Sequence, residues 1–436
     1  MVNQHLLTDI GQANHWRQRI VAGDLVSCSQ RILIDESAAT TGHRAVIKFQ
    51  QRNILNNENQ WHDLNAGSGD KSPGQFAFLF PGIGYHEIKA INMLFAVQPF
   101  KTFIEAAFDY LREQHDIGLK SLLTDGSAAV SSRNFAHKLK RVKQGAAAEN
   151  AHKTLFAHPL LFVFQLGFAH LLESIGIKAS YLLGYSLGEY SAATLAGAFS
   201  QQQALDLIAF RAKQINTLPG AGLLAVAAPA ADVEPLLTEG VEIAAINSPL
   251  QTIVAGSEPG LQQFRLVLDS HNQVAQAVTV QHGFHSSYMR PIVEPLSGYL
   301  QEQPVSRLQQ CWISTIDCCE YPPGSVIPNH YWPEQLLRPV NFQDSIQRLL
   351  KHDCMLIEIS SGNALSLLVK QNPQCPRSQW SRLLAPLASV SADGDVLGAL
   401  LEFVISLWLR GEPIVFSGFG ESISTKVAAL ADKERI

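Results

Sequence analysis

The 436-residue sequence lacks the features that mark several common protein classes. Only 16% of its residues are charged, and 33 Lys and Arg stand against 38 Asp and Glu, for a formal net charge of -5. A nucleic-acid-binding surface needs a basic stripe, so this balance predicts no nucleic-acid partner. Six cysteines without a CxxC pair are too few for a disulfide scaffold, and the adjacent Cys318 and Cys319 are poorly arranged to chelate one zinc ion. We therefore predict reduced thiols, no metal site and a cytoplasmic location.

Long hydrophobic runs are also missing. The most apolar run, residues 159–172, is interrupted by Gln165 and His170 and is shorter than the roughly 20 residues that a membrane-spanning helix needs. The first 20 residues lack the apolar core of a signal peptide. Hydrophobic residues nevertheless make up 46% of the chain, as in ordinary globular proteins. We therefore predict a buried helix over 155–175 and no membrane partner.

The chain divides by composition into four predicted regions. Short strands within 30–37 and 43–49, followed by a Gly- and Ser-rich stretch at 65–74, indicate an N-terminal α/β subdomain over 1–75. The continuous apolar runs FAFLF (76–80) and YLLG (181–184) are typical of buried parallel strands and indicate a large subdomain over 76–217 and 281–385. Residues 386–436 are a predicted tail with one helix. Residues 127–149 are small, polar and basic, and predict a surface loop with a charged helix.

The fourth region, 218–280, changes character. Its pattern predicts strands and helices in the order β-α-β-β-α-β, which is the ferredoxin-like arrangement. The expected fold class is therefore α/β, with a parallel sheet in the large subdomain and a smaller ferredoxin-like subdomain inserted into it.

The strongest catalytic motif is GYSLG at 184–188, which lies between a predicted strand and an Ala-rich helix. This GxSxG pattern is the nucleophile elbow of α/β-hydrolase-like sheets, in which glycines allow a strained turn to display a serine at a helix N-terminus. The pattern predicts Ser186 as a nucleophile, with the backbone N–H of Leu187 facing a developing oxyanion. The alternative is a structural turn that happens to contain a serine.

A serine nucleophile needs a base, usually histidine, and the chain has 15 histidines. His285 lies in a loop, HGFHS (282–286), that leaves the small subdomain. A loop histidine is more often a surface residue than a catalytic one, so the residue pattern alone leaves His285 as an open candidate.

Ordered motifs along 76–385 resemble the acyltransferase domains of modular polyketide synthases, which are related to malonyl-CoA:acyl carrier protein transacylases. The motifs are FLFPGIG (78–84), GYSLGEY (184–190), AAIN (244–247), VAG (254–256), HGFHS (282–286), YW (331–332) with RPVNF (338–342), and EISSG (358–362). Segments 24–25 and 43–46 resemble the linker between ketosynthase and acyltransferase, and 407–416 resembles the tail after the acyltransferase. No ketosynthase is present, so the resemblance implies a free-standing, trans-acting member that retains a linker-like subdomain over 1–75.

The resemblance implies roles for the residues that perform the chemistry. Ser186 would be the nucleophile, and His285 the general base and then the general acid. The backbone carbonyl of Gln335 would orient His285, and the N–H groups of Ile83 and Leu187 would hold the oxyanion.

The resemblance also assigns the substrate pocket, formed by Arg211, Phe284, Tyr185 and His158. Arg211, 25 positions after Ser186, matches the arginine that binds the free carboxylate of a malonyl group, for which a planar guanidinium is well shaped. By itself Arg211 would be interpreted as a solvated residue at a helix end. Leu187 and Phe284 are similar to residues of malonyl-selective members, where a bulky ring restricts the α-carbon.

Three residues depart from the family pattern. Ile83 replaces the Gln of PGQG, His158 replaces another Gln, and Tyr185 replaces the His of GHS. All three are expected near the acyl pocket or the oxyanion loop, where they would weaken the oxyanion site or reshape the pocket for an unusual extender unit.

The expected function is transfer of a malonyl-type extender unit, by ping-pong chemistry, to the phosphopantetheine thiol of an acyl carrier protein in polyketide or hybrid peptide–polyketide secondary metabolism. No bound cofactor is expected, and the acyl donor would be a CoA or carrier-protein thioester. Three alternatives stay open: aminomalonyl or hydroxymalonyl transfer between carrier proteins, a proofreading acyl hydrolase, and a non-catalytic docking module. Arg211 argues against the hydrolase, because an unpaired buried guanidinium is costly. The presence of Ser186 and His285 as well argues against the docking module.

Overall fold

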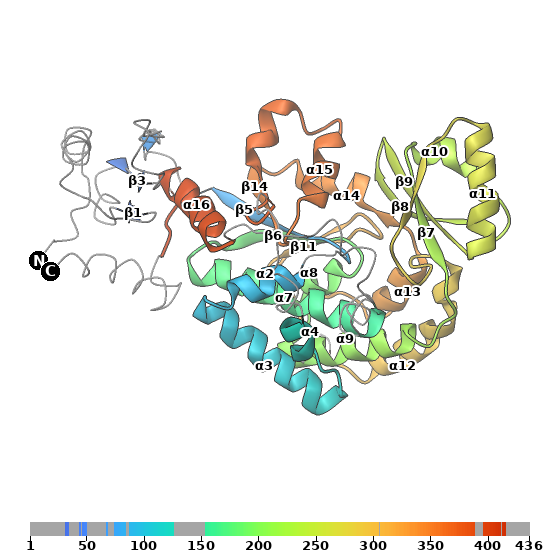
Figure 1. Cartoon of the computed structure of the whole chain (residues 1–436), viewed down its shortest axis with the longest axis horizontal. Coiled ribbons are helices and arrows are strands. Elements are labelled where there is room, and N and C mark those ends of the chain that lie inside the picture. Colours follow the sequence, from blue (N-terminus) through green and yellow to red (C-terminus); the bar gives the residue numbers. More distant parts are fainter. Residues whose placement is uncertain are drawn as a thin grey trace, which may run out of the picture.

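The computed structural model describes residues 31–34, 43–44, 46–49, 67–68, 74–83, 87–125, 153–304, 306–388, 396–410 and 412–415. The loop and helix predicted at 127–149 lie outside these residues, as does much of the predicted subdomain 1–75. The described chain forms a large lobe on a six-stranded sheet and a small lobe on a five-stranded sheet (Figure 1). The predicted α/β class, with a large and a small subdomain, is confirmed.

The sheet of the large lobe is parallel apart from one edge strand. Its strands run in the order β12-β11-β6-β5-β14-β15, with bounds β5 (Gln75–Phe80), β6 (Ala179–Gly184), β11 (Cys311–Ile313), β12 (Glu320–Tyr321), β14 (Cys354–Glu358) and β15 (Leu383–Leu384). Only β12 is antiparallel. Central β5 pairs with β6 and β14, and all its residues after the first are buried. A strand covered on both faces must be apolar throughout, as the FAFLF run predicted.

Helices cover both faces of this sheet (Figure 1). One layer contains α2 (Glu87–Leu94), α3 (Gln98–His115), α4 (Lys120–Asp125), α7 (Thr154–Ser174), α8 (Gly188–Leu195) and α9 (Gln201–Ile215). The opposite layer contains α14 (Phe342–Leu349) and α15 (Ala364–Gln371). The sheet is therefore the middle of three layers, which is why its strands carry few polar residues.

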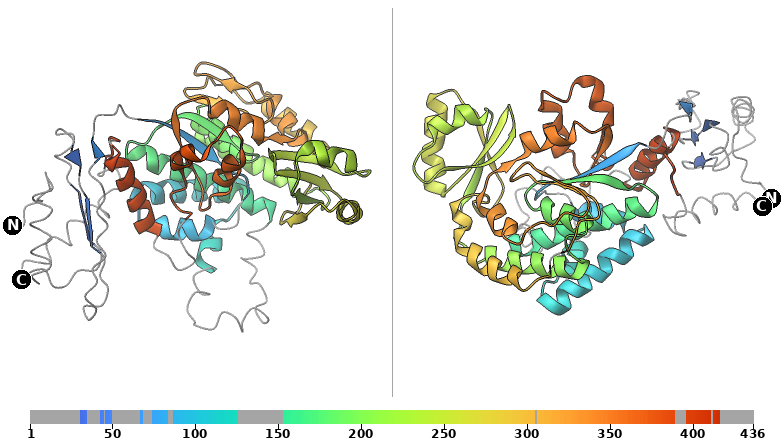
Figure 2. Two further views of the ribbon diagram at one scale, coloured as in Figure 1. Left: turned by 90° about the horizontal axis from the view of Figure 1, so that it is seen from above. Right: turned by 180° about the vertical axis from the view of Figure 1, so that it is seen from behind.

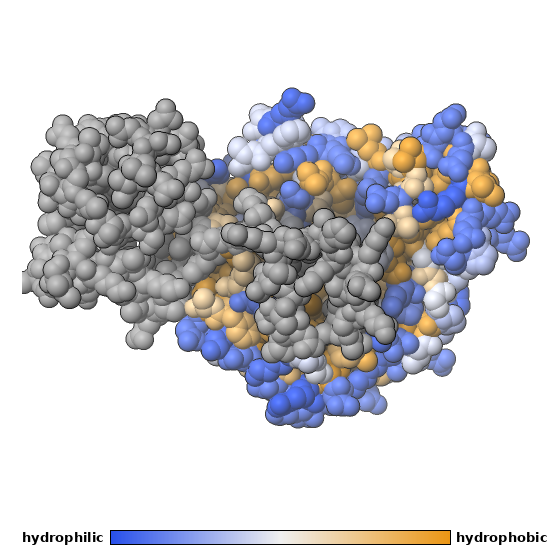
Figure 3. All heavy atoms as spheres, viewed as in Figure 1, coloured by the Kyte–Doolittle hydropathy of each residue, from blue (hydrophilic) through white to orange (hydrophobic). Residues whose placement is uncertain are grey.

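Helix α7 packs between α3 and α9. It is the one helix among the described residues that is long and apolar enough to cross a membrane, but 83% of its most apolar window is buried inside the protein. The buried helix predicted for 155–175 is confirmed. Neighbouring α3 is amphipathic, with Phe100, Ile104 and Phe108 buried at helical spacing. Hydrophilic side chains gather along the lower edge of the molecule, where α3 runs (Figure 3).

The small lobe is built on β7 (Gly222–Val226), β8 (Glu242–Ser248), β9 (Gln251–Gly256) and β10 (Ala275–Val278), with α10 (Ala230–Val233) and α11 (Glu258–Ser270). The predicted β-α-β-β-α-β order is present, and the strand order β10-β7-β9-β8 is antiparallel throughout. A fifth strand, β13 (Val340–Asn341), pairs in parallel with β8. It comes from outside 218–280, so the small sheet includes a strand from the chain of the large lobe. The small lobe projects from one end of the large lobe in all views (Figure 2).

The remaining elements are short or lie outside the two sheets. They are η4 (Ser287–Ile292), α12 (Val293–Gln301), α13 (Tyr331–Leu337), η3 (Glu234–Leu236), η5 (Arg377–Arg382) and α16 (Val396–Leu409). In the N-terminal region, β1 (Arg31–Ile34) pairs with β3 (Val46–Phe49), and β2 (His43–Arg44) pairs with β4 (Gly67–Ser68). The strands β1, β2 and β3 overlap the two short strands predicted there, whereas β4 lies in the Gly- and Ser-rich stretch that was predicted as a linker.

Candidate active site

Ser186 lies on a strained turn between β6 and α8. Its φ angle is 54°, in the left-handed region that non-glycine residues seldom adopt. The N–H of Tyr185 donates to the carbonyl of Phe80 on the neighbouring strand at 2.8 Å. A Cβ atom on Gly188 would lie 1.9 Å from that carbonyl oxygen, and one on Gly184 would lie 2.2 Å from the backbone of α8. Both glycines of the motif are therefore required by close backbone approach, and the predicted strand, turn and helix are all present.

The structure brings His285 to Ser186, although 99 positions separate them. Ser186 Oγ lies 2.6 Å from His285 Nε2. His285 Nδ1 lies 2.9 Å from the carbonyl oxygen of Gln335 and 3.2 Å from that of Arg338. Carbonyl oxygens only accept hydrogen bonds, so Nδ1 carries the proton of the neutral ring and Nε2 presents its lone pair to the serine.

Burial, followed by the nearby positive charge of Arg211, lowers the pKa of His285 to about 4, against the two backbone hydrogen bonds that raise it. Loss of the charged form is the expected result of placing an imidazole, 5% exposed, in an apolar surrounding. His285 is therefore neutral near pH 7 and able to accept a proton from Ser186.

This pKa predicts the acid limb of the pH profile. We expect kcat/KM for acylation to fall only below about pH 5, with an apparent pKa of about 4, because protonated His285 cannot accept the serine proton. The measurement uses a CoA thioester between pH 4 and 7, with the melting temperature followed in the same buffers to exclude unfolding. An acid limb centred near the ordinary histidine pKa, about 6.5, would contradict the burial argument.

Arg211 is almost fully buried, with 2% of its surface exposed, on α9. Its Nη1 donates to His158 Nδ1 at 2.7 Å, and its guanidinium lies 5.1 Å from the centre of the Tyr190 ring. Because His158 Nδ1 accepts, its Nε2 carries the ring proton. The Arg211 guanidinium and the Tyr190 hydroxyl interact with each other, whereas the buried His158 Nε2 has no hydrogen-bond partner among the described residues. Buried donors without partners are costly, so this cluster is suited to an anionic or polar ligand.

Phe284 connects this cluster to the serine and histidine. Its side chain is buried, and its ring centre lies 5.5 Å from that of His158. Burial, followed by the charge of Arg211, holds the pKa of His158 well below its usual range, so His158 is a neutral hydrogen-bonding group. Phe284 precedes His285 directly, so one segment contacts both His158 of the Arg211 cluster and Ser186.

The loop that contains Ile83 lies against the serine. A Cβ atom on Gly82 would lie 3.5 Å from Ser186 Cβ, and Ile83, the next residue, is half-buried. Gln165 on α7 holds this loop by donating to the carbonyl of Pro81 at 2.7 Å. On the other side of the serine, the N–H of Leu187 makes no hydrogen bond with the described residues.

Tyr185 joins the two lobes. Its hydroxyl donates to Asn247 Oδ1 on β8 at 2.9 Å, and Asn247 Nδ2 donates to Gln251 Oε1 at 2.8 Å. The Tyr185 ring packs edge-on against Phe342 at the start of α14. Tyr185, which replaces the family's histidine, therefore connects the turn that carries Ser186 to the small lobe.

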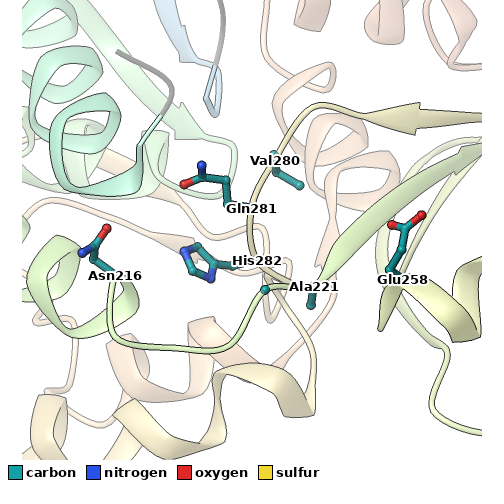
Figure 4. Close-up of a pocket in the computed structure, with 7 residues that line it drawn as sticks. Asn216, Ala221, Glu258, Val280, Gln281 and His282 are labelled. Carbon is teal, nitrogen blue, oxygen red and sulfur yellow. The ribbon is translucent and has the colours of Figure 1, made fainter. Parts of the chain in front are cut away.

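A cavity of about 550 Å³ lies where the two linkers between the lobes meet; its lining residues are Asn216, Gly220, Ala221, Glu258, Val280, Gln281 and His282 (Figure 4). Figure 4 shows Gln281 and His282 pointing to the side of Asn216, with Glu258 on the small lobe. The His282 ring contacts Phe284, with 5.9 Å between ring centres. The cavity therefore adjoins the segment that carries His285. In the part of the chain that the structure describes, no three His, Cys, Asp or Glu side chains gather as a metal site.

An α/β fold with a serine on a nucleophile elbow, hydrogen-bonded to a neutral histidine, is the arrangement of enzymes that form an acyl-enzyme on serine, either to transfer or to hydrolyse the acyl group. The comparison with known sequences agrees: the chain belongs to the acyl transferase domain family, which matches residues 77–375. The predicted acyltransferase class, of the type found in polyketide synthases, is therefore confirmed.

Similar sequences occur in polyketide synthases. The chain is 27% identical over 357 residues to a phenolphthiocerol/phthiocerol polyketide synthase of Mycobacterium tuberculosis, covering 80% of this chain and 22% of the relative. It is 25% identical over 273 residues to the polyketide synthase GfsA of Streptomyces halstedii, covering 61% of this chain and 4% of the relative. The chain thus spans about a fifth or less of these relatives.

Solved structures show the same fold. The acyltransferase domain from the second module of the salinomycin polyketide synthase has a TM-score of 0.70 at 21% identity, covering 95% of each chain. The acyl transferase domain of ZmaA also gives 0.70 at 21% identity, covering 95% of this chain and 94% of the other. A complex of a malonyl-transacylase with its acyl-carrier protein gives 0.58 at 20% identity, covering 75% and 99%.

The sequence analysis missed several residues that shape the site. They are Gln165, Asn247, Tyr190, Glu189 and Arg338. One signal was available: Glu189 is an acidic residue in an otherwise small and apolar helix, where a charge is unexpected. No signal in the sequence pointed to the carbonyl of Arg338 or the amide of Asn247, because the role of each group depends on which distant segment lies beside it in the fold.

Proposed function

We propose that this chain transfers a malonyl-type acyl group from a thioester to the phosphopantetheine thiol of an acyl carrier protein, through an ester on Ser186. The observation that carries the proposal is the juxtaposition of the Ser186–His285 pair with the buried guanidinium of Arg211, which lies close enough to lower the pKa of His285.

In the first half-reaction, Ser186 Oγ bonds to the thioester carbon while its proton passes to His285 Nε2. The oxyanion of the tetrahedral intermediate accepts hydrogen bonds from the N–H groups of Leu187 and Ile83. Collapse breaks the carbon–sulfur bond, and His285 returns the proton to the departing sulfur. In the second half-reaction, the carrier's thiol gives its proton to His285 and its sulfur attacks the Ser186 ester, so that Oγ leaves and is protonated again. Gln335 and Arg338 hold the histidine in the tautomer that both steps need.

The free carboxylate of a malonyl group is the ligand that best suits Arg211. An unpaired buried guanidinium destabilises a site for a neutral acyl chain by several kcal/mol, which argues against a proofreading hydrolase. The 2.6 Å contact between Ser186 and His285 argues against a purely non-catalytic docking module, which would have no need of it. No bound cofactor takes part in this proposal, and the acyl group arrives as a CoA or carrier-protein thioester.

A second candidate is a malonyl group with a compact polar α-substituent, such as aminomalonyl or hydroxymalonyl, delivered by a carrier protein. The observation that favours it is His158, whose neutral ring bonds Arg211 through Nδ1 and leaves a buried Nε2 donor without a partner among the described residues. A hydroxyl or an unprotonated amine on the α-carbon has a lone pair that accepts a hydrogen bond from this Nε2–H group, whereas the α-carbon of unsubstituted malonyl carries no acceptor.

Donor choice is the direct test. The chain is incubated separately with malonyl-CoA and with carrier proteins loaded with malonyl or aminomalonyl groups, and intact masses are measured. We expect a malonyl-type adduct that is lost on adding an unloaded carrier protein. Rapid release of free acid from long acyl thioesters without an acceptor would favour the hydrolase, and absence of any adduct would favour the docking module. Transfer to a carrier protein on a separate chain also tests action in trans, which stays a prediction.

A further inference from the structure

His285 has a strained backbone, like the serine that it contacts. Its φ angle is 60°, in the left-handed region that residues other than glycine seldom adopt. Such a conformation persists only where surrounding contacts hold it. The carbonyl oxygens of Gln335 and Arg338 in the large lobe hold the ring of His285. Those bonds act on the imidazole, so the backbone of the loop 282–288 must be held by other contacts.

Part of the support comes from side chains of the loop itself. Ser286 Oγ donates to the carbonyl of Gly283 at 2.6 Å, which closes the chain around the strained residue. The side chain of Tyr288 packs on Gly283, where an added Cβ atom would lie 3.2 Å from Tyr288 Cβ. Gly283 and Tyr288 therefore lie against each other, with His285 in the turn between them.

Two side chains attach this loop to the small lobe. The carboxylate of Glu242, the first residue of β8, accepts from the N–H of Ser287 at 3.0 Å through Oε2 and from the hydroxyl of Ser287 through Oε1. The Tyr288 hydroxyl donates to the carbonyl of Gly240 at 3.0 Å and accepts from the N–H of Ser257 at 2.9 Å. The base is therefore held by the large lobe through its ring and by the small lobe through its loop.

Strand β8 also contacts the turn of the nucleophile. Asn247, near the end of β8, accepts from the Tyr185 hydroxyl at 2.9 Å, and Tyr185 directly precedes Ser186. The same strand packs against α14 and pairs with β13, which begins two residues after Arg338 (Figure 1). One strand of the small lobe thus contacts the segment that carries the nucleophile, the loop that carries the base, and the strand next to an acceptor of the base.

We propose that Glu242 is a positioning residue that, from β8, holds the His285 loop where Nε2 meets Ser186 Oγ. The inference rests on the proposed roles of Ser186 and His285. Tyr288 acts on the same loop through its own bonds to the small lobe. Without these contacts the loop relaxes toward an unstrained φ angle, which moves the imidazole away from the serine. A displacement of about 1 Å at a reacting group lowers a rate by up to roughly 10²-fold.

The donors on Ser287 determine which substitution of Glu242 keeps the contact. The N–H of Ser287 can only donate, whereas its hydroxyl can donate or accept. Glutamine at position 242 keeps both bonds, because Oε1 accepts from the N–H while Nε2 donates to the hydroxyl oxygen. Alanine removes both bonds. The proposal therefore predicts that the amide replaces the carboxylate and that a methyl group does not.

The test compares Glu242→Ala, Glu242→Gln and Tyr288→Phe with the wild type, all as the full chain. Thr252→Val is the matched control, because the Thr252 hydroxyl donates to the carbonyl of Ala228 within the small lobe. The first measurement is the rate at which phenylmethanesulfonyl fluoride modifies Ser186, followed by intact mass. This reagent requires an activated serine but neither a malonyl group nor a carrier protein. The second measurement is kcat and KM for malonyl-CoA.

We expect Glu242→Ala and Tyr288→Phe each to lower the sulfonylation rate and kcat by roughly 10-fold. KM should change little, because the pocket around Arg211 is untouched. Glu242→Gln should restore most of the loss seen with alanine. Thr252→Val should keep the wild-type rates although its melting temperature falls. All rates are measured at a temperature below the melting transition of every variant.

Wild-type rates in both Glu242→Ala and Tyr288→Phe would overturn the proposal. An equal loss of rate in Thr252→Val would also overturn it, by indicating a general loosening of the small lobe, and so would a glutamine variant as slow as the alanine variant. If the wild type is sulfonylated at Ser186 but transfers no malonyl group, the proposed function fails while the sulfonylation rates still decide the inference. A wild type that is not sulfonylated at all would overturn the inference, because no reactive pair would be present.

Discussion

Replacing Ser186 with alanine is expected to abolish the acyl-enzyme and to lower acyl transfer by roughly 10³-fold or more. The reason is that Ser186 Oγ is the atom that bonds to the acyl carbon, and His285 Nε2, 2.6 Å away, has no other hydroxyl to activate in this contact. The measurement is the intact mass of the chain after incubation with malonyl-CoA, together with the rate of carrier-protein loading. Ser270→Ala, at an exposed serine on α11, is the matched control and should keep the adduct.

An adduct of unchanged yield in Ser186→Ala would show that acylation occurs elsewhere, and the nucleophile assignment would be wrong. Loss of the adduct together with a lower melting temperature would instead point to a folding defect. We expect no such defect, because Ser186 is half-buried on the surface of the turn and alanine preserves its backbone.

Arg211→Ala is expected to separate malonyl from simple acyl donors. Removing one partner of a buried ion pair costs about 3–5 kcal/mol, which corresponds to a loss of roughly 10²- to 4 × 10³-fold in malonyl loading. Acetyl loading should change far less or improve, because an acetyl group has no carboxylate to pair with the guanidinium. The measurement is kcat/KM for malonyl-CoA and for acetyl-CoA, and the malonyl value divided by the acetyl value is compared between the variant and the wild type. Arg290→Ala, at an exposed arginine, is the control and should leave the ratio unchanged.

An equal fall for both donors would contradict a carboxylate role and would indicate that Arg211 supports the pocket through His158 and the Tyr190 ring. Unchanged malonyl loading would exclude the role altogether. Because Arg211→Ala leaves the His158 and Tyr190 groups near a small void, the melting temperature is needed to confirm that the variant is folded.

The chain's local pattern predicted the elements that hold the site. The run FAFLF became the central strand β5, the GYSLG motif became the turn between β6 and α8, and the apolar segment after residue 154 became buried helix α7. These outcomes depend on burial and on backbone geometry at close range. A continuous apolar run can be buried only inside the fold, and only glycine fits at position 188, where a Cβ atom would lie 1.9 Å from the carbonyl oxygen of Phe80.

The tertiary structure decided which distant residues meet. No periodicity selects His285 among 15 histidines, because its partner Ser186 lies 99 positions away. In the same way, β13 joins the sheet of the small lobe, Tyr185 reaches Asn247, and Tyr331 donates to Glu189. The sequence by itself determined which segments are buried and where the backbone can turn, since those properties are set by neighbouring residues. The packing of lobes and helices determined the hydrogen bonds, tautomer and pKa values of the site, since these depend on atoms that only the folded chain brings within a few ångströms.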